Sequence, residues 1–398
     1  MTAESQITLP EFPMRRGCPF DPPPQYERMR ADGPAFRVRL PDGMSAWVVT
    51  RYADVRRLLV DPRISSDRTM PGYPFLTEDS RYLSQVRVFV GMDPPDHGPH
   101  RRVFIPDFTA RRIKALRPAI EANVTARLAE MARGPRPADI VTALALPVPT
   151  LAIGTLLGVP EATYPTFAGL TGALMAEQPE PATFDELLAF IRALVVDKCA
   201  EPTDDLLGRV AAEQVNTGAM TVHELVIVAM LLLFAGYETT ANMIALGTLT
   251  LLRHPEQLAR LRADPGLLPQ AVDELLRYLS IAELATCRTA LADIDLGGGV
   301  VIRAGEGVIP LGASANRDPA AFERADEFDI HRAERHHIAF GYGPHQCIGA
   351  NLARLELEVV FEALLRDFPD LRLAVPVEDL RFKLDANLFG VHELPVTW

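Results

Sequence analysis

One cysteine stands where a reactive thiolate is expected, inside the stretch "AFGYGPHQCIGANLARLEL". Cys347 follows two nearby glycines and precedes a helical pattern in which Leu352, Leu355 and Val359 share one face. At a helix start, the macrodipole and free backbone N–H groups favour a thiolate over a thiol. Because glycines have no side chain, a flat, bulky partner has room to approach the sulfur. The stretch therefore predicts a cysteine that binds a metal or a metal-bearing group.

An axial thiolate ligand for a haem iron is the favoured interpretation, but the residues alone leave rivals. An ordinary buried cysteine is a common alternative. A dinucleotide-binding loop is disfavoured, because the glycine pair lacks a third glycine and no βαβ unit surrounds it. A zinc site has suitable ligands but no standard spacing. Its elements beside Cys347 would be His331, His336, His337 and His345.

A second group with chemical potential, Glu238 and Thr239, lies with Thr240 and Asn242 in the middle of a long apolar segment. A hydroxyl and a carboxylate there could pass protons from water to bound oxygen, and Gly236 would leave space for that ligand. The alternative is structural: Thr239 hydrogen-bonds to a helix carbonyl, and Glu238 pairs with an arginine. The segment alone favours neither interpretation.

The segment that carries these polar residues is predicted to be one helix of about 30 residues, or ~45 Å. Thr221 and Glu224 form a capping-box pattern at its start, and Pro255 limits its end. A membrane span is disfavoured, because the uncharged run 225–237 is only about 13 residues long. We therefore expect a buried core helix.

Three motifs resemble those of the cytochrome P-450 superfamily, and they occur in that family's order. Residues 340–349 are similar to its haem-binding loop, residues 235–240 to its oxygen-activation motif, and Glu274-x-x-Arg277 to its ion pair. The stretch "FPMRRGCPFDPPPQY" further resembles soluble actinomycete members of natural-product pathways. The resemblance covers essentially the whole chain. The haem-loop motif is highly specific, whereas the other two are specific only in combination.

The resemblance implies a single domain over residues 1–398, mainly α with a minor β portion, with haem b between the long helix and the helix after Cys347. It implies Cys347 as the iron ligand and Glu238, Thr239 and Gly236 as catalytic residues. The residues that it assigns to haem binding are Cys347, Phe340, Gly349, His97, Arg101, Arg288 and His345. His97 and Arg101 would share a helical face if the helix begins before Gly98-Pro99; otherwise His100 could compete.

The resemblance also implies that the Glu274–Arg277 pair is buried and supports the haem loop. An exposed pair at this spacing would contribute only about 0.2–0.5 kcal/mol. The chain departs from the family pattern nearby, because Glu327 stands where many members have an arginine. Arg332 is the candidate that would complete the network.

The implied activity is a monooxygenase that uses O2 to hydroxylate or epoxidise a hydrophobic small molecule in secondary metabolism. The rivals are haem-thiolate chemistry without oxygenation (dehydration, coupling, peroxide use) and a haem-binding sensor. Electrons would come from a ferredoxin and its reductase, docking on a basic patch drawn from Arg102, Arg111, Arg112, Lys114 and Arg354. The expected apolar substrate contacts are Val86, Val88, Phe89, Leu233, Ala235, Leu284 and Ala285. Three arginines could meet an acidic substrate group: Arg68, Arg81 and Arg87.

Composition narrows the cellular setting. The formal net charge is −12 and the pI about 5.3, which argues against nucleic acid and anionic membranes as partners. The four cysteines lie far apart, and no secretory signal pattern is visible, so we expect reduced thiols, a cytoplasmic location and a monomer.

Local patterns predict the remaining elements. Residues 36–50 should form a β-hairpin with a turn at 41–43, and Tyr52–Val60 a short helix. A long loop should run from residue 65 across the following Pro- and Gly-rich stretch. From residue 111 the chain should be mostly helical, returning to short strands over 285–311.

Overall fold

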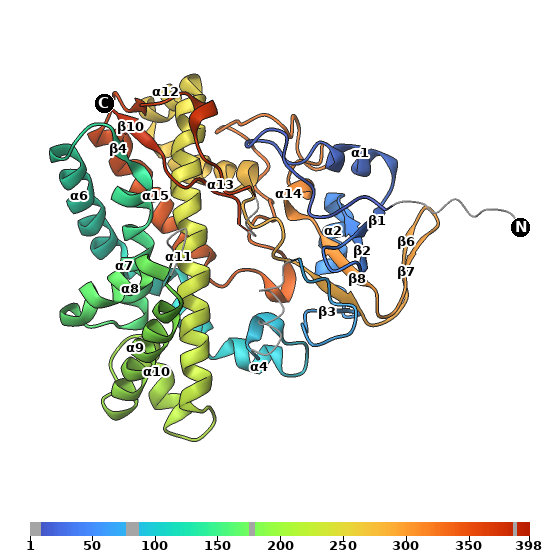
Figure 1. The fold of residues 1–398 in the computed structure, drawn as a ribbon, viewed down its shortest axis with the longest axis horizontal. Coiled ribbons are helices and arrows are strands. Elements are labelled where there is room, and N and C mark those ends of the chain that lie inside the picture. The colour runs from blue at the N-terminus through green and yellow to red at the C-terminus, as the bar shows by residue number, and fades with distance from the viewer. Residues whose placement is uncertain (1–8, 77–86, 175–179, 385–387) are drawn as a thin grey trace, which may run out of the picture.

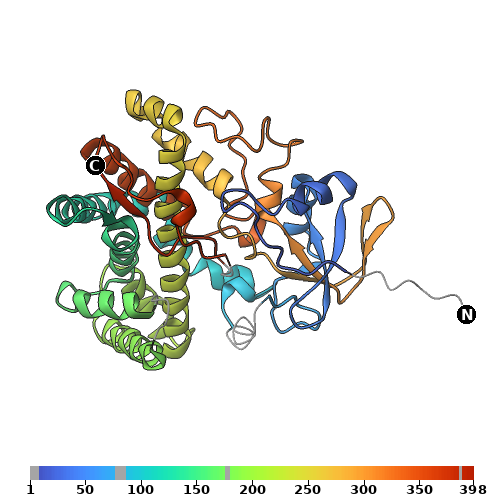
Figure 2. The ribbon, with the colours of Figure 1, turned by 45° about the horizontal axis from the view of Figure 1, so that its top comes forward.

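The computed structural model describes residues 9–76, 87–174, 180–384 and 388–398. Helices dominate the fold and gather on one side of the molecule, whereas most of the strands lie on the opposite side (Figures 1 and 2). The N-terminal end lies on the sheet side, and the C-terminal end lies among the helices. The mainly α architecture with a minor β portion is confirmed.

The central element is α11 (Val222–Arg253), which runs the length of the helical part (Figure 1). Its capping box is confirmed: Glu224 N–H donates to Thr221 Oγ1 at 3.1 Å, and Thr221 N–H donates to the Glu224 carboxylate at 2.7 Å. α11 ends at Arg253, just before Pro255, as predicted, and Pro255 is the first residue of α12 (Pro255–Ala263). α11 is long and apolar enough to cross a membrane, but 56% of its most apolar window is buried inside the protein. It is therefore the core helix that the sequence predicted.

Helices pack around α11 on several sides, and the polypeptide segments before and after it supply them. The helices in contact with α11 include α7 (Pro147–Leu157), α9 (Pro181–Ala200), α13 (Leu268–Leu279) and α15 (Ala350–Asp367). The other α-helices among the described residues are α1 (Gln25–Asp32), α2 (Tyr52–Leu59), α4 (His97–Arg102), α5 (Ala110–Ala115), α6 (Arg117–Arg133), α8 (Tyr164–Leu174), α10 (Leu206–Val210) and α14 (Gly312–Ala315).

The largest sheet has the strand order β1-β2-β8-β5-β3. The predicted hairpin is confirmed by β1 (Ala35–Arg39) and β2 (Ser45–Val49), which pair antiparallel with Ala35 opposite Val49. β8 (Gly307–Pro310) adds to β2 in parallel. The remaining strands of this sheet are β5 (Arg288–Ala290) and β3 (Ile64–Ser65). Arg288 is the first residue of β5, which lies between β8 and β3, and its side chain is buried.

Two smaller sheets complete the β portion. β6 (Ile294–Gly297) and β7 (Val300–Ile302) form a two-stranded hairpin. β10 (Pro395–Thr397) lies between β4 (Ala138–Asp139) and β9 (Arg372–Leu373). The third sheet ties the C-terminal end to the segment before α7, on the helical side of the protein.

Candidate active site

The loop that carries Cys347 is shaped by its glycines. Gly341 and Gly343 have φ values of +72° and +76°, a backbone region that favours glycine. A Cβ on Gly343 would also lie 2.6 Å from Val60 Cγ1, so the loop packs tightly on the end of α2. The backbone N–H of Cys347 donates to the Phe340 carbonyl at 2.8 Å. Three residues after Cys347, α15 begins, as the sequence predicted.

The Cys347 side chain combines solvent exposure with a largely protein-lined surrounding. Enough protein surrounds it that burial raises the pKa of its thiol. The Gly349 N–H, Arg101 and Arg354 act in the opposite direction and lower the Cys347 pKa. In the protein alone, desolvation thus outweighs the helix start, which differs from the expected net preference for a thiolate.

Four predicted basic residues meet beside this loop. His97 and Arg101 lie one turn apart on α4, Arg288 is buried on β5, and the His97 and His345 rings stack with centroids 4.0 Å apart. Arg101 also donates to the Gln346 carbonyl, which joins α4 to the cysteine loop. α4 begins at His97 despite Pro99, because the first turn of a helix needs no proline N–H.

The chemistry of this cluster fits the propionates of haem b. His97 Nε2 and His345 Nδ1 are buried nitrogens without a hydrogen-bond partner. Burial, together with Arg288, His97 and Arg101, lowers the pKa of His345 to about 3. Unpaired buried nitrogens beside two guanidinium groups require anionic or acceptor partners. The cluster and the accessible Cys347 sulfur together match a flat cofactor with a metal and two carboxylates.

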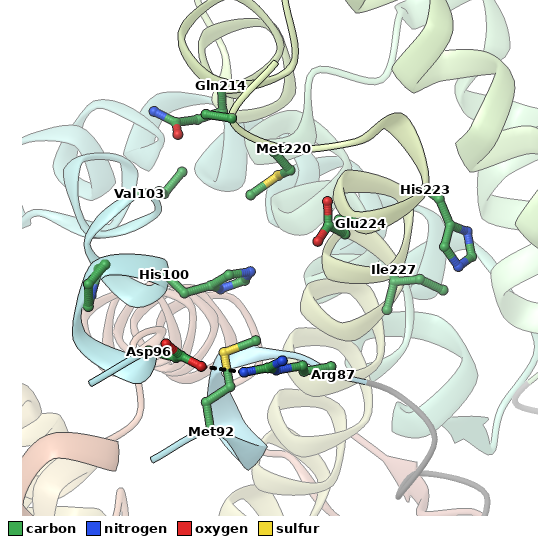
Figure 3. A pocket seen from close by; sticks show the side chains of 12 residues that line it. Arg87, Met92, Asp96, His100, Val103, Gln214, Met220, His223, Glu224 and Ile227 are labelled. Carbon is green, nitrogen blue, oxygen red and sulfur yellow. Dashed lines mark hydrogen bonds and ion pairs between the residues drawn. The ribbon is translucent and has the colours of Figure 1, made fainter. Parts of the chain in front are cut away.

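His100, the competitor weighed for His97, has a different environment. Its ring contacts Phe89 and Phe104, with centroids 6.3 Å and 5.8 Å away. It points into a separate pocket of about 600 Å³ between α4, the π-helix 211–215 and the start of α11 (Figure 3). The Arg87–Asp96 ion pair stands at one side of this pocket. His97 is therefore the histidine of α4 that joins His345.

The polar residues of α11 occupy a stretch where the helix borders open space. Ala235 is exposed and Thr239 half-buried, although most of α11 on both sides is buried. Thr239 Oγ1 donates to the Ala235 carbonyl at 2.7 Å. This is the bond to a helix carbonyl that the sequence indicated as the structural interpretation of Thr239. Glu238 has an ion-pair partner, but it is Lys383 at 3.6 Å rather than an arginine.

Two further residues of α11 add detail. A Cβ on Gly236 would lie 3.4 Å from Ile153 Cδ1 of α7, an ordinary contact distance, so helix packing does not by itself require glycine here. Thr240 Oγ1 lies 3.4 Å from Oε2 of Glu356, which is 1% exposed. Burial raises the pKa of Glu356 well above its usual range, which favours the protonated carboxyl. The helical pattern of α15 gave no signal for a buried acid at this position.

The Glu274–Arg277 network is buried as the resemblance implied. Arg277 Nε lies 2.8 Å from Glu274 Oε2, and both side chains are almost fully buried. Arg332 Nε lies 3.1 Å from the same oxygen, which confirms Arg332 as the completing residue. Glu327, where the family often has arginine, pairs with Arg324 at the surface at 2.9 Å.

This network supports the segment that leads to Cys347. Arg277 donates to the carbonyls of Asn316 and Ala325, both at 2.7 Å. The Asn316 side chain in turn accepts the Ile338 N–H at 2.8 Å, two residues before Phe340. The network therefore holds the chain on which the cysteine loop begins.

The expected substrate contacts divide into two groups. Val88, Phe89 and Leu233 are at most 2% exposed and pack in the hydrophobic core, the alternative that the sequence had left open for them. Ala235 and Ala285 are exposed and Leu284 is half-buried. Val86 and Arg81 lie outside the described residues.

Several polar expectations have specific outcomes. Arg87 pairs with Asp96. Arg68 lies beside buried Tyr73: burial raises the pKa of Tyr73, and the charge and hydrogen bond of Arg68 partly offset this increase. In the described part of the chain, no group of three His, Cys, Asp or Glu side chains is placed to hold a metal ion. His337 instead contacts Asp273 at 3.4 Å. The zinc alternative is therefore wrong for these residues.

Of the basic residues proposed for partner docking, three are exposed and two are engaged. Arg112 lies 2.5 Å from Asp204, and Arg354 lies 2.8 Å from Asp273. The exposed ones are Arg102, Arg111 and Lys114. α5 carries Arg111 and Lys114 and packs against α15, the helix that follows Cys347, whereas Arg102 is the last residue of α4.

Comparison with known proteins agrees with these features. The family model described as cytochrome P450 matches residues 182–396. Over 97% of both chains, the protein is 49% identical to the pentalenic acid synthase of Streptomyces avermitilis. It is 47% identical to the vitamin D3 dihydroxylase of Streptomyces griseolus, over 100% of this chain and 99% of that protein. The crystal structure of cytochrome P450 MoxA from Nonomuraea recticatena superposes with a TM-score of 0.94 over 98% of each chain, at 48% identity.

Proposed function

The chain belongs to the cytochrome P450 family, and from this membership we propose that it inserts one oxygen atom of O2 into a hydrophobic small molecule. It is a cytochrome P450 monooxygenase, and its cofactor is haem b. The proposed outcome is hydroxylation or epoxidation of a secondary metabolite. In support, the relatives include a pentalenic acid synthase and a mycinamicin VIII C21 methyl hydroxylase, 49% and 45% identical.

Cys347 is the proposed axial ligand of the iron. The support is its accessible sulfur at the start of α15, beside the loop glycines. Haem supplies an oxygen-activating iron when bound, and a thiolate ligand favours O–O cleavage. His97, Arg101, Arg288 and His345 would bind the propionates, because they combine two guanidinium groups with two unpartnered buried nitrogens. Phe340 and Gly349 would shape the loop around the sulfur.

Glu238 and Thr239 are the proposed proton-delivery residues. Glu238 is half-buried, so its carboxylate can exchange protons with water and pass them inward. The Thr239 hydroxyl donates to the Ala235 carbonyl here, so holding bound oxygen requires it to exchange this acceptor for the ligand. The role of Gly236 in leaving space for a ligand stays a proposal, because a Cβ there would meet Ile153 only at an ordinary contact distance and packing alone does not require glycine.

A ferredoxin is the proposed electron donor. Arg102 is exposed at the end of α4, and Arg111 and Lys114 are exposed on α5, which packs on α15. A local cationic patch on a chain of net charge −12 would attract and orient an acidic partner. The proposed location is the cytoplasm, and the proposed substrate contacts are reduced to Ala235, Leu284 and Ala285.

The single observation that carries this proposal is the accessible Cys347 sulfur beside the basic cluster. The test is the absorption spectrum of the dithionite-reduced protein with and without carbon monoxide. We expect a strongly red-shifted Soret band, and we expect Cys347→Ala to lose it. A Soret band typical of histidine ligation in the wild type, or an unchanged band in the variant, would refute the ligand assignment.

Reconstitution then tests the electron donor. Supplying NADPH, a ferredoxin and its reductase should support O2 consumption by the holoenzyme. Rising ionic strength should weaken ferredoxin binding, because charged surfaces dominate the encounter. O2 consumption that does not depend on ferredoxin, or a peroxide-only reaction, would favour the non-oxygenating alternative.

A further inference from the structure

The partner of Glu238 is a lysine from the other end of the chain. Lys383 Nζ lies 3.6 Å from Glu238 Oε1 and 3.3 Å from Asn242 Oδ1, one helical turn further along α11. Both charged side chains are half-buried, at 21% and 34% exposure. A single ammonium thus contacts two consecutive turns of the polar face of α11. The C-terminal segment that carries it runs beside this helix (Figures 1 and 2).

Lys383 stands on backbone that is itself fixed against α11. Its N–H donates to the Gly390 carbonyl at 2.8 Å, and residues 382 and 391 form an antiparallel bridge. A Cβ on Gly390 would lie 2.3 Å from Asn242 Oδ1, so the backbone there touches the Asn242 amide directly. The Phe389 N–H also donates to the Ile281 carbonyl at 3.1 Å. The ion pair is therefore held from both sides, unlike a pair of long side chains on an open surface.

The residue type at this position stands out against the composition. The chain has 40 lysines and arginines together, and only Lys114, Lys198 and Lys383 are lysines. An arginine would clamp a carboxylate with two parallel hydrogen bonds, whereas a lysine is a compact charge with three rotatable donors. Lysine therefore orients Glu238 while leaving one carboxylate oxygen for other partners.

We propose that Lys383 is a positioning residue for proton delivery, which holds the Glu238 carboxylate at one place on α11. The proposal rests on the proposed role of Glu238. A glutamate at this exposure has several rotamers, and ordering it requires a fixed partner. Proton transfer needs an acid within hydrogen-bond reach of its acceptor. Glu238 takes the proton from water and passes it inward, while Lys383 neither gains nor loses one. The C-terminal segment thereby becomes part of the proton-delivery machinery.

The test uses the haem-loaded enzyme with NADPH, a plant-type ferredoxin and its reductase, and no organic substrate. Under these conditions each O2 ends as hydrogen peroxide or, after proton delivery and further reduction, as water. The readout is the fraction of NADPH electrons recovered as peroxide. We expect Lys383→Gln and Glu238→Gln each to raise this fraction about twofold or more, with the double variant no higher than Glu238→Gln. Lys383→Arg should give a value between those of wild type and Lys383→Gln, because it returns the charge but can occupy both carboxylate oxygens.

A second readout does not depend on turnover. The unfolding free energies of the wild type, Lys383→Gln, Glu238→Gln and the double variant form a double-mutant cycle, which should show coupling between Lys383 and Glu238. The matched control is Arg381→Gln, which removes an exposed cation that pairs with Glu393 on the same segment. Each variant is first checked for the wild-type carbon monoxide spectrum, so that loss of haem is not mistaken for loss of proton delivery.

The outcomes separate the two proposals. If Glu238→Gln raises the peroxide fraction but Lys383→Gln does not, or if the two effects add, Lys383 has no positioning role and the proposed function stands. If Glu238→Gln itself leaves the peroxide fraction unchanged, the proton-delivery role of Glu238 falls, and this inference falls with it. If Arg381→Gln raises the fraction as much as Lys383→Gln, the effect belongs to the segment and the proposal is overturned.

Discussion

At the scale of single residues, the site combines groups that are costly to bury without partners. Two histidine nitrogens lack hydrogen-bond partners beside Arg101 and Arg288, and Glu356 is a buried acid with one unpartnered oxygen. Such groups are uncommon in protein interiors, because each unmade hydrogen bond costs about 1–3 kcal/mol. On the proposed assignment, haem propionates would accept the hydrogen bonds of the two histidines. Glu356 lies outside that cluster and has a separate consequence.

Glu356 predicts a pH dependence of stability. Its pKa is raised in the folded protein by burial, so the folded state holds this proton more tightly than the unfolded chain does. The stabilisation is complete below the unfolded pKa of about 4.3 and is lost as pH rises toward the folded pKa. Relative to wild type, Glu356→Gln should therefore become progressively more stable as pH rises above that value. Urea unfolding at pH 5, 6 and 7 measures this, and parallel curves for the two proteins would contradict it.

At the scale of elements, the cysteine loop depends on contacts between α13 and the segment that follows α14. Arg277 and Arg332 both contact the Glu274 carboxylate, and the Arg277 guanidinium also binds three carbonyls of the segment. These bonds hold an irregular stretch that has no regular backbone ladder of its own. The geometry of the loop therefore depends on one buried network rather than on local preference.

Removing Arg277 should destabilise the fold and loosen the haem. Arg277→Met leaves Arg332 as the one remaining cation on the Glu274 carboxylate and removes the Arg277 bonds to the Asn316 and Ala325 carbonyls, so we expect a loss of about 3–5 kcal/mol in the free energy of unfolding. Denaturant titration measures that loss, and the Soret absorbance per protein measures haem content. The control is Arg324→Met, which removes a surface ion pair and should change stability by only about 0.2–1 kcal/mol. Equal losses in the two variants would contradict the support role.

At the scale of the whole molecule, the site joins parts that the chain order keeps apart. The basic cluster takes residues from α4, β5 and the cysteine loop, and α11 contributes the polar face. The helical part and the sheet part therefore meet where the cofactor residues gather (Figure 2). A bound haem would contact both parts at once.

Haem removal should therefore lower the stability of the whole protein. A ligand that binds only the folded state stabilises it by about 4 kcal/mol when present at 1,000 times its dissociation constant. In addition, the haem-free protein leaves His97, His345 and two arginines without propionates. We expect the holoenzyme to have a clearly higher Tm than the haem-extracted protein, by calorimetry at one protein concentration. An unchanged Tm would contradict the assignment of this cluster to the cofactor.

Much of the local structure followed from the sequence alone. The capping box of α11, the β1–β2 hairpin, the helix start after Cys347 and the Glu274–Arg277–Arg332 network were all predicted and are present. The capping box, the hairpin and the helix start have short spacings, so local backbone preferences and hydrogen bonds are enough to determine them, whereas the network was predicted from the family resemblance. Cys347 itself was recognisable because its loop glycines are needed for a left-handed backbone.

Other features were decided only by tertiary structure. The sequence could not pair Glu238 with Lys383, show that Glu356 is buried, or reveal that Gly236 faces Ile153. Val88, Phe89 and Leu233 were equally explicable as substrate contacts or core, and packing made them core. The reason is physical: burial and long-range pairing depend on which segments pack together, and a residue's own neighbours in the chain do not encode that.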